Sequence, residues 1–522
     1  MSFKLSRFTI PEFGGEHNVS YRVWAAGLAA TNSDGATNDN IARRTEILRF
    51  ILTLLSKTLY CEPKKLTVFD NKWATLLVNE ESHVVQVLLC SLLNVICGYD
   101  PSGWGGVPYN HLLFGDVQEP LVTVAIQVLS SLLDYKSWDS SFTNKSFSQS
   151  APVESDNPVT NVFLDTPGDS PENSPNRFVY YTARIHEQAD VQLISNGLAR
   201  LFRNPQDAAK SYLPGATKKI SLTTELMSLL WVLLDCNKAL HQKIVEQGTA
   251  LILTEALLGV CLEVRHDIAR AGHLRIACFI LHLLSQERGY GVSLNEPFDT
   301  SYIGALSRHL PIFSQGCWAD FVYLSAFVIL STKGPLRPVV LSVQEPLLAI
   351  LTNTSPLIKS LTVTTGNKLL ALFDVFSNPA FLFSKEYNFR MLHHILGFFN
   401  NIIQYQYAGN AQLAYSIVRH KPKIDKLYSM TFESATAEVE RLYQLSSEKK
   451  KSLSVSQSTE SIMLLGSESK ENLNRNASNS DLIGATTNTS GASVKHAEET
   501  PIKVVQAAII KGKVEFQTKN LK

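Results

Sequence analysis

The sequence contains few charged residues for its length. Asp, Glu, Lys and Arg make up 18% of the 522 residues, below the roughly 25% that is usual in soluble domains. The formal net charge is only +1, which excludes the broad positive field that drives binding to nucleic acids. The hydrophobic content is ordinary at 45%. Low charge with normal apolarity predicts extensive surface buried between helices or against partners.

Long hydrophobic runs are also missing. No apolar segment followed by a small-residue cleavage site stands near Met1, so no signal peptide is expected. Four apolar stretches reach about half of the roughly 20 residues that a bilayer crossing requires. We interpret them as buried helices, and an integral membrane protein is the alternative. They comprise residues 226–234, 275–284, 321–330 and 395–403.

The seven cysteines are an odd number, and they lack the paired spacing of a disulfide framework or a zinc site. Most of them lie inside apolar helical patterns, which predicts buried, reduced thiols in a cytosolic protein. Cys90 and Cys97 are seven residues apart on one face of a predicted helix. We expect both in the core.

No motif of catalysis or cofactor binding is present in the sequence. His393 and His394 are adjacent, so they point to different helix faces and do not form the i, i+4 pair of zinc hydrolases. The loop with Gly103, Gly105 and Gly106 lacks the lysine and hydroxyl of a P-loop; we interpret it as a structural elbow. The prediction is no catalytic, cofactor-binding or metal residue and no enzyme, with an enzyme of scattered site residues as the less favoured alternative.

What is abundant is helical patterning. Apolar residues recur at helical spacing from about residue 47 onward, and no clear strand pattern interrupts them. Pro205, Pro214, Pro311, Pro335 and Pro356 are expected between helices or at first turns. The predicted helices start near residue 40 and cover 73–77, 84–97, 119–133, 177–186, 190–203, 222–237, 238–247, 251–262, 272–285, 319–331, 339–353, 355–376, 386–406 and 411–419.

Many similar helices without strands predict an all-α fold, an α-solenoid-like stack of helix pairs of HEAT or armadillo type with disordered insertions and a disordered C-terminal tail. No repeat of fixed period is visible, so any repetition is structural. The predicted segments are an irregular start (1–39), a helical region (40–135), a Ser/Pro/Asp-rich disordered loop (136–176), a helical solenoid region (177–445) and a low-complexity, mostly disordered tail (446–522).

The predicted loop contains three sites of proline-directed phosphorylation, Thr166, Ser170 and Ser174, each followed by proline. A phosphate would add strong negative charge there. The alternative is an inert insertion, because Ser-Pro and Thr-Pro pairs are frequent in segments of this composition.

Polar residues inside apolar helices form the last group of candidates. Asn400, Asn401 and Gln404 are expected to be buried amides that hydrogen-bond a neighbouring helix, with a partner groove as the alternative.

Two short basic clusters, Lys218-Lys219 and the lysines at 449–451, are interpreted as solvated surface rather than membrane contacts, because so few charges bind a bilayer weakly.

Several sequence blocks resemble the high-temperature-induced dauer-formation (Hid) family, which is related to the dymeclin-type Golgi proteins. The main blocks are VPYNHLLF at 107–114 with EPLV at 119–122, PGATKKI at 214–220 and FNNIIQYQ at 399–406. Supporting matches lie at 283–288, 353–361 and 367–370, and the resemblance covers residues 21–419 in the order of the family.

This resemblance implies a helical scaffold that lies peripherally on the cytosolic face of the Golgi and trans-Golgi network. It implies a role in protein sorting and dense-core secretory vesicle biogenesis, with the Golgi membrane and trafficking proteins as partners and no nucleic acid, small-molecule substrate or cofactor. Family members begin with Met-Gly for N-myristoylation, whereas Ser2 replaces the acceptor glycine here. We therefore expect a fragment that lacks both family termini, with a true short isoform as the alternative.

Overall fold

A computed structural model describes residues 22–32, 36–62, 71–101, 116–136, 171, 174–210, 218–298, 308–311, 315–332, 337–442 and 444–445. The chain divides into two compact units, one of residues 1–368 and 398–413 and the other of 369–397 and 414–522. Each unit is described by itself. The predicted segment boundaries at residues 39, 135, 176 and 445 stay predictions.

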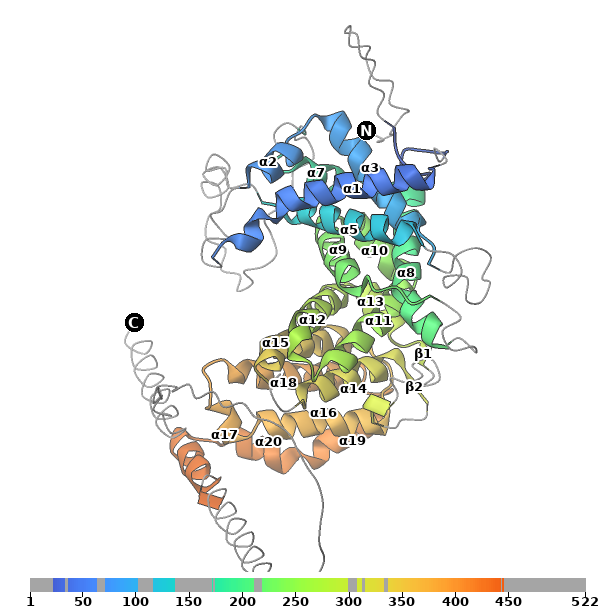
Figure 1. Cartoon of the computed structure of the whole chain (residues 1–522). Coiled ribbons are helices and arrows are strands. Elements are labelled where there is room, and N and C mark those ends of the chain that lie inside the picture. Colours follow the sequence, from blue (N-terminus) through green and yellow to red (C-terminus); the bar gives the residue numbers. More distant parts are fainter. Residues whose placement is uncertain are drawn as a thin grey trace, which may run out of the picture. The chain divides into compact units, whose positions relative to one another are not determined.

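The first unit is a double row of helices (Figure 1). In each row every helix contacts the next one, and the rows contact each other through the pairs α3–α5, α8–α9, α11–α12 and α14–α15. One row contains α1 (Asn38–Leu55), α5 (Gln118–Asp134), α9 (Thr223–Cys236), α12 (Ala271–Ser285) and α15 (Arg337–Thr354). The other contains α3 (Ser82–Gly98), α8 (Gln188–Lys210), α11 (Thr249–Val264) and α14 (Trp318–Leu330). This arrangement confirms the predicted solenoid-like stack of helix pairs.

Short elements connect the rows. They are η1 (Ser56–Tyr60), α2 (Lys72–Val78), α7 (Arg177–Ala183), α10 (Lys238–Glu246), η5 (Ile268–Arg270), α13 (Arg288–Ser293) and η7 (Ser355–Leu357). Two strands of two residues each, β1 (Pro297–Phe298) and β2 (Gly316–Cys317), pair antiparallel. Together these elements bring the chain from the end of one long helix to the start of the next.

The core lies between the two rows. Most residues of α11 and α14 are buried, since each of these helices is covered by neighbours on several sides. Such all-round burial agrees with their nearly uninterrupted apolar sequences. Two pairs of buried hydroxyls bond each other in this core: Tyr290 with Thr254 at 2.9 Å and Tyr323 with Thr354 at 2.8 Å. These pairs satisfy groups that would otherwise each cost about 1–3 kcal/mol.

The second unit contains the later part of α16 (Val363–Phe376), α17 (Pro379–Leu382), the first part of α18 (Asn388–Tyr405), the end of α19 (Ala411–Arg419) and α20 (Lys421–Tyr428). Phe376 and Phe381 pack with ring centroids 5.2 Å apart. The Lys423 ammonium lies 2.6 Å from the Asp374 carboxylate. α16, α18 and α19 each have residues in both units.

Two details of the helix prediction are wrong. Pro205 does not separate helices but lies inside α8, which continues to Lys210. The buried side chains of Leu198, Leu201 and Phe202 hold this helix in the stack and offset the hydrogen bond that proline cannot donate. The predicted helix at 355–376 is interrupted, because η7 ends at Leu357 and α16 begins at Val363.

The length argument against membrane spans is also incomplete. Joined to η5, α12 forms an apolar segment, Ile268–Ser285, that is long enough to cross a bilayer, and two bent helix pairs pass the same test as joined segments. In the fold, α12 packs against α9, α11 and α15, and its buried face includes Leu274, Ile280 and Leu284. The apolar residues on this face of α12 are therefore used in helix packing, whereas Ile268 and Phe279 are exposed.

Candidate functional site: polar helix junctions and a recess beside α2

Three buried asparagines, Asn71, Asn176 and Asn237, join the end of one helix to the start of another. Each is the N-cap of the helix that follows, and its side-chain oxygen accepts from a backbone N–H of the first turn. Each amide nitrogen donates to carbonyls at the end of an earlier helix, groups that lack partners within that helix. The accepting carbonyls are Leu54 and Leu55 for Asn71, Leu132 and Tyr135 for Asn176, and Thr182 and Ile185 for Asn237.

The first two sequence blocks meet in a charged cluster. The Lys218 ammonium lies 2.6 Å from the Asp116 carboxylate and 2.5 Å from that of Glu119, although about 100 residues separate them along the chain. The Tyr99 hydroxyl donates to the same Asp116 oxygen at 2.6 Å. The Lys218 side chain is only 15% exposed. The prediction of a solvated Lys218 is therefore wrong, because two carboxylates from a distant part of the sequence enclose it.

The pKa values in this cluster follow from its contacts. Burial alone raises the pKa of Asp116, but hydrogen bonds from Lys218, Tyr99 and the Gln118 amide outweigh it, and the pKa lies below its usual range. Burial alone lowers the pKa of Lys218, and the two carboxylates reverse this and raise it. Burial and the hydrogen bond to Asp116 raise the pKa of Tyr99. All three shifts favour a charged Asp116, a charged Lys218 and a neutral Tyr99, which suits an electrostatic brace.

The same junction includes a close approach of two helices. The Arg200 guanidinium of α8 donates to the carbonyls of Cys97 and Tyr99 at 2.5 and 3.0 Å, which caps the end of α3. A Cβ on Gly197 would lie 2.7 Å from the Cys97 Cα atom. Only glycine allows α8 and α3 to approach this closely. Cys97 and Cys90 are buried as expected, and burial raises the pKa of each thiol to about 12.

The third block makes a further junction within the first unit. Asn401 donates to the Thr352 carbonyl at 3.2 Å and to the Ser355 hydroxyl at 3.0 Å, which confirms its predicted role of bonding a neighbouring element. Gln406 donates to the Pro356 carbonyl at 2.7 Å. The prediction is wrong for Asn400 and Gln404, which are exposed and bond each other at 3.4 Å. They lie on the outer face of α18, one turn apart.

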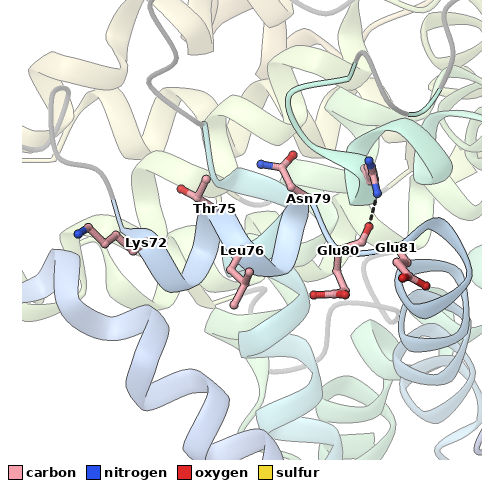
Figure 2. A pocket seen from close by; sticks show the side chains of 7 residues that line it. Lys72, Thr75, Leu76, Asn79, Glu80 and Glu81 are labelled. Carbon is pink, nitrogen blue, oxygen red and sulfur yellow. Dashed lines mark hydrogen bonds between the residues drawn. The ribbon is translucent and has the colours of Figure 1, made fainter. Parts of the chain in front are cut away.

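An open recess of about 660 Å³ lies beside α2. Figure 2 shows side chains from one side of α2 and from the turn that follows it. Arg177, the first residue of α7, closes one wall by donating from Nη1 to the Glu80 carbonyl. The lining residues are Lys72, Thr75, Leu76, Asn79, Glu80, Glu81 and Arg177.

The floor of this recess is tied to the asparagine junctions. The Tyr135 hydroxyl, just after α5, is 2.6 Å from Thr75 Oγ1 and 3.4 Å from the Asn71 carbonyl. Arg177 follows the cap Asn176 directly, and its Nε is buried with no hydrogen-bond partner among the described residues. A buried donor without a partner costs about 1–3 kcal/mol, so Arg177 retains an unused hydrogen-bond donor beside the recess.

The remaining predicted sites are placed as follows. Ser174 is described, and its hydroxyl donates to the Asn176 carbonyl at 3.1 Å. His393 is exposed and His394 half-buried, and the described part of the chain contains no group of three metal-ligating residues. Outside the described residues lie Ser2, Thr166, Ser170, the loop with Gly103, Gly105 and Gly106, and the lysines at 449–451.

The asparagine junctions were not predicted, although a signal for them exists. Asn176 and Asn237 stand directly before Arg177 and Lys238, where predicted helices begin, and asparagine at that position is a strong N-cap. The sequence does not indicate which earlier carbonyls the amide reaches. That information depends on how the helices pack.

Paired helices that stack in two rows and are tied at their ends define an α-solenoid protein. Residues 3–519 match the sequence profile of the Hid1 family, described as high-temperature-induced dauer-formation protein. The chain belongs to this family, as the sequence blocks predicted.

Relatives extend the comparison. Protein HID1 of Homo sapiens is 36% identical over 415 residues, which cover 79% of this chain and 50% of the relative. Protein HID1 of Dictyostelium discoideum is 30% identical over 415 residues, 79% of this chain and 44% of the relative. Ubp5-interacting protein ftp105 of Schizosaccharomyces pombe is 27% identical over 431 residues, 81% of this chain and 43% of the relative. The chain spans about half the length of the curated relatives it matches, and none of these names states an enzymatic activity.

Proposed function

We propose that this chain is part of a non-catalytic scaffold on the cytosolic face of the Golgi and trans-Golgi network, where it acts in protein sorting and dense-core secretory vesicle biogenesis. Its membership of the Hid1 family supports the organelle and the pathway. A stack of helix pairs supports the scaffold role, because it presents a long surface on which several partners bind side by side.

One observation carries the scaffold role: large apolar side chains are exposed on α1 and α2. Ile47 and Phe50 of α1 are 57% and 65% exposed, and Trp73 and Leu76 of α2 are 49% and 57% exposed. We name these four residues the α1–α2 apolar edge. Large apolar side chains that are exposed on neighbouring surface helices favour a binding surface. Because each side chain is already partly buried, covering its exposed part would contribute roughly half of the 1.5–3 kcal/mol of full burial.

The proposed partners are trafficking proteins and the Golgi membrane, to which the scaffold binds peripherally, through a lipid anchor or through partner proteins. The name of the relative in Schizosaccharomyces pombe, Ubp5-interacting protein ftp105, describes an interaction with another protein. That name supports protein binding as the shared property.

The test uses secretory cells from which the resident Hid1-family protein has been removed. The tagged chain is expressed as wild type, as Phe50→Glu with Leu76→Glu, and as the control Val292→Glu, which alters an exposed apolar residue of α13 that is 51% exposed. We expect wild type and control to co-purify with Golgi membranes and trafficking proteins, and the double variant to lose the proteins at an unchanged melting temperature.

Two results would contradict the proposal. A wild-type chain spread through the cytosol, with no captured trafficking protein and no effect on dense-core cargo, refutes the Golgi role. Equal capture by the double variant refutes the α1–α2 apolar edge as the binding surface.

The Ile268–Ser285 segment favours a second candidate, an integral membrane protein. Alkaline carbonate extraction separates the two. A peripheral scaffold is released to the supernatant, whereas a chain that spans the bilayer stays in the pellet.

A further inference from the structure

Ser174 lies where the end of α5 is joined to the start of α7. Its hydroxyl donates to the carbonyl of Asn176, the residue that caps α7 and holds the end of α5. Its backbone N–H donates to the Pro171 carbonyl at 3.4 Å. Ser174 is half-buried, so part of it faces solvent, and Pro175 follows it. A serine before proline is the acceptor sequence of proline-directed kinases.

We propose that Ser174 is a regulatory phosphorylation site, and that Arg177 binds the phosphate and thereby releases the Glu80 carbonyl at the end of α2. The donor is ATP. The Ser174 oxygen forms a bond to the γ-phosphorus, the bond between that phosphorus and the β,γ-bridging oxygen breaks, ADP leaves with the electron pair, and the hydroxyl proton passes to the kinase base. This inference is independent of the scaffold role, because its test needs only the purified chain.

The first consequence concerns the existing hydrogen bond. A phosphorylated Ser174 oxygen has no hydrogen to donate, so its bond to the Asn176 carbonyl is lost. The phosphate carries a charge of about −1.5 to −2 at neutral pH and repels that carbonyl oxygen. The phosphate must therefore move away from Asn176 toward positive charge.

The second consequence concerns Arg177, three residues further along. Among the described residues its Nε is a buried donor without a partner, and its Nη1 donates to the neutral Glu80 carbonyl. A bond between arginine and phosphate is roughly twice as strong as one to a neutral acceptor. The phosphate therefore competes successfully for the guanidinium.

The charges of the other residues that line the recess determine where the phosphate and Arg177 move. Glu80 and Glu81 are negative and repel a phosphate, whereas Lys72, across the recess, attracts it. The phosphate and Arg177 together withdraw from the Glu80 side. The turn between α2 and α3 then loses its contact with α7 and becomes more mobile.

The experiment uses the full chain with Thr166→Ala, Ser170→Ala and Thr500→Ala, so that Ser174 is the proline-directed site that remains at the surface; Ser355, also before proline, is fully buried. A proline-directed kinase with MgATP modifies it, and intact mass with peptide mapping measures the stoichiometry. A chain that retains Thr166 in place of Ser174 is the matched control for added charge.

Two measurements follow on the phosphorylated chain. Titration by ³¹P NMR should place the phosphoserine midpoint at least about half a pH unit below its usual value of about 6, and Arg177→Gln should restore it while Arg177→Lys keeps most of the shift. Hydrogen exchange in α2 should become about tenfold faster, as expected for the loss of a hydrogen bond to a charged group. In Arg177→Gln, exchange should be fast already and insensitive to phosphate.

Any of three results would overturn the proposal. The first is that the kinase leaves Ser174 unmodified in the folded chain. The second is that the phosphate titrates alike with Arg177 and in the Arg177→Gln variant, and the third is that exchange in α2 does not respond to phosphorylation. If Arg177→Gln unfolds the chain, the phosphate titration and the exchange in α2 are compared between Arg177→Lys and the Thr166-phosphorylated control. Equal values in the two would overturn the proposal.

Discussion

The substitution Asn176→Leu tests whether buried asparagines hold the helix pairs together. Asn176 is 3% exposed, and its side chain makes four hydrogen bonds. Its oxygen accepts from the N–H groups of Phe178 and Val179 at 2.9 and 3.3 Å, and its nitrogen donates to the carbonyls of Leu132 and Tyr135 at 2.7 and 3.0 Å. Leucine has nearly the same shape and makes none of these bonds.

The magnitude follows from the groups left without partners. Loss of an N-cap costs about 1 kcal/mol, and each buried carbonyl that loses its donor costs about 1–3 kcal/mol. The added apolar burial of leucine offsets part of this sum. We expect a loss of about 2–4 kcal/mol in the stability of the α5–α7 junction.

Hydrogen exchange measured by mass spectrometry suits this prediction, because the chain forms two units and a single unfolding transition is not assured. Amides of α7 and of the end of α5 should lose about 30- to 1,000-fold of their protection. Asn176→Ser keeps an oxygen for the cap but removes the amide nitrogen. Its loss of protection should be smaller than that of Asn176→Leu, and it measures the hydrogen bonds from the amide nitrogen to the end of α5.

Asn196→Leu is the matched control, because Asn196 is exposed on α8 and its side-chain oxygen accepts from Gln192 one turn earlier on the same helix. It should change stability by less than about 0.5 kcal/mol. If the α7 amides are as well protected from exchange in Asn176→Leu as in this control, the asparagine does not hold the junction and the reasoning fails.

Two further predictions concern the other junctions. Asn401→Leu should lower the melting temperature, because the Thr352 carbonyl and Ser355 lose a donor; an unchanged melting temperature would instead favour the partner-groove interpretation. The charged cluster should make stability depend on pH in two windows. The pKa of Asp116 is lowered by folding, so its contribution is present above about pH 4, the unfolded value, and disappears as the pH falls through the lower folded pKa. The pKa of Lys218 is raised, so its contribution is present below about pH 10 and disappears as the pH rises through the higher folded pKa. Melting curves of Asp116→Asn between pH 7 and pH 3 should lose the acid-dependent part that wild type and the exposed control Asp425→Asn both keep; parallel curves for all three would rule out the brace.

Helix positions were predictable because apolar spacing and capping residues act locally. The predicted helix at 411–419 agrees with α19, and those at 84–97 and 119–133 end within two residues of α3 and α5. Pro205 was misplaced because the cost of a proline inside a helix is local, whereas the packing that outweighs it involves α3, α9 and α11. A prediction from local sequence does not include this packing energy.

The junctions were predictable only in part. Asn401 stands out in the sequence as an amide in an apolar helix, and it bonds as expected. Asn400 and Gln404 have the same sequence signal and are exposed, because the rotation of α18 about its axis decides which amide faces the neighbouring element. Lys218 looked like an ordinary surface lysine for the same reason: Asp116 and Glu119 become its neighbours only when α5 and α9 pack together.

The sequence by itself determined the helical class, most helix boundaries and the family, because these depend on periodicity, on caps and on short blocks of residues along the chain. Tertiary structure alone decided which distant groups meet: the Asn176 amide with the end of α5, Lys218 with two carboxylates, and Arg177 with the end of α2. The physical reason is that burial and hydrogen bonding are properties of neighbours in space. A residue therefore acquires a role such as brace or cap only when the stack assembles around it.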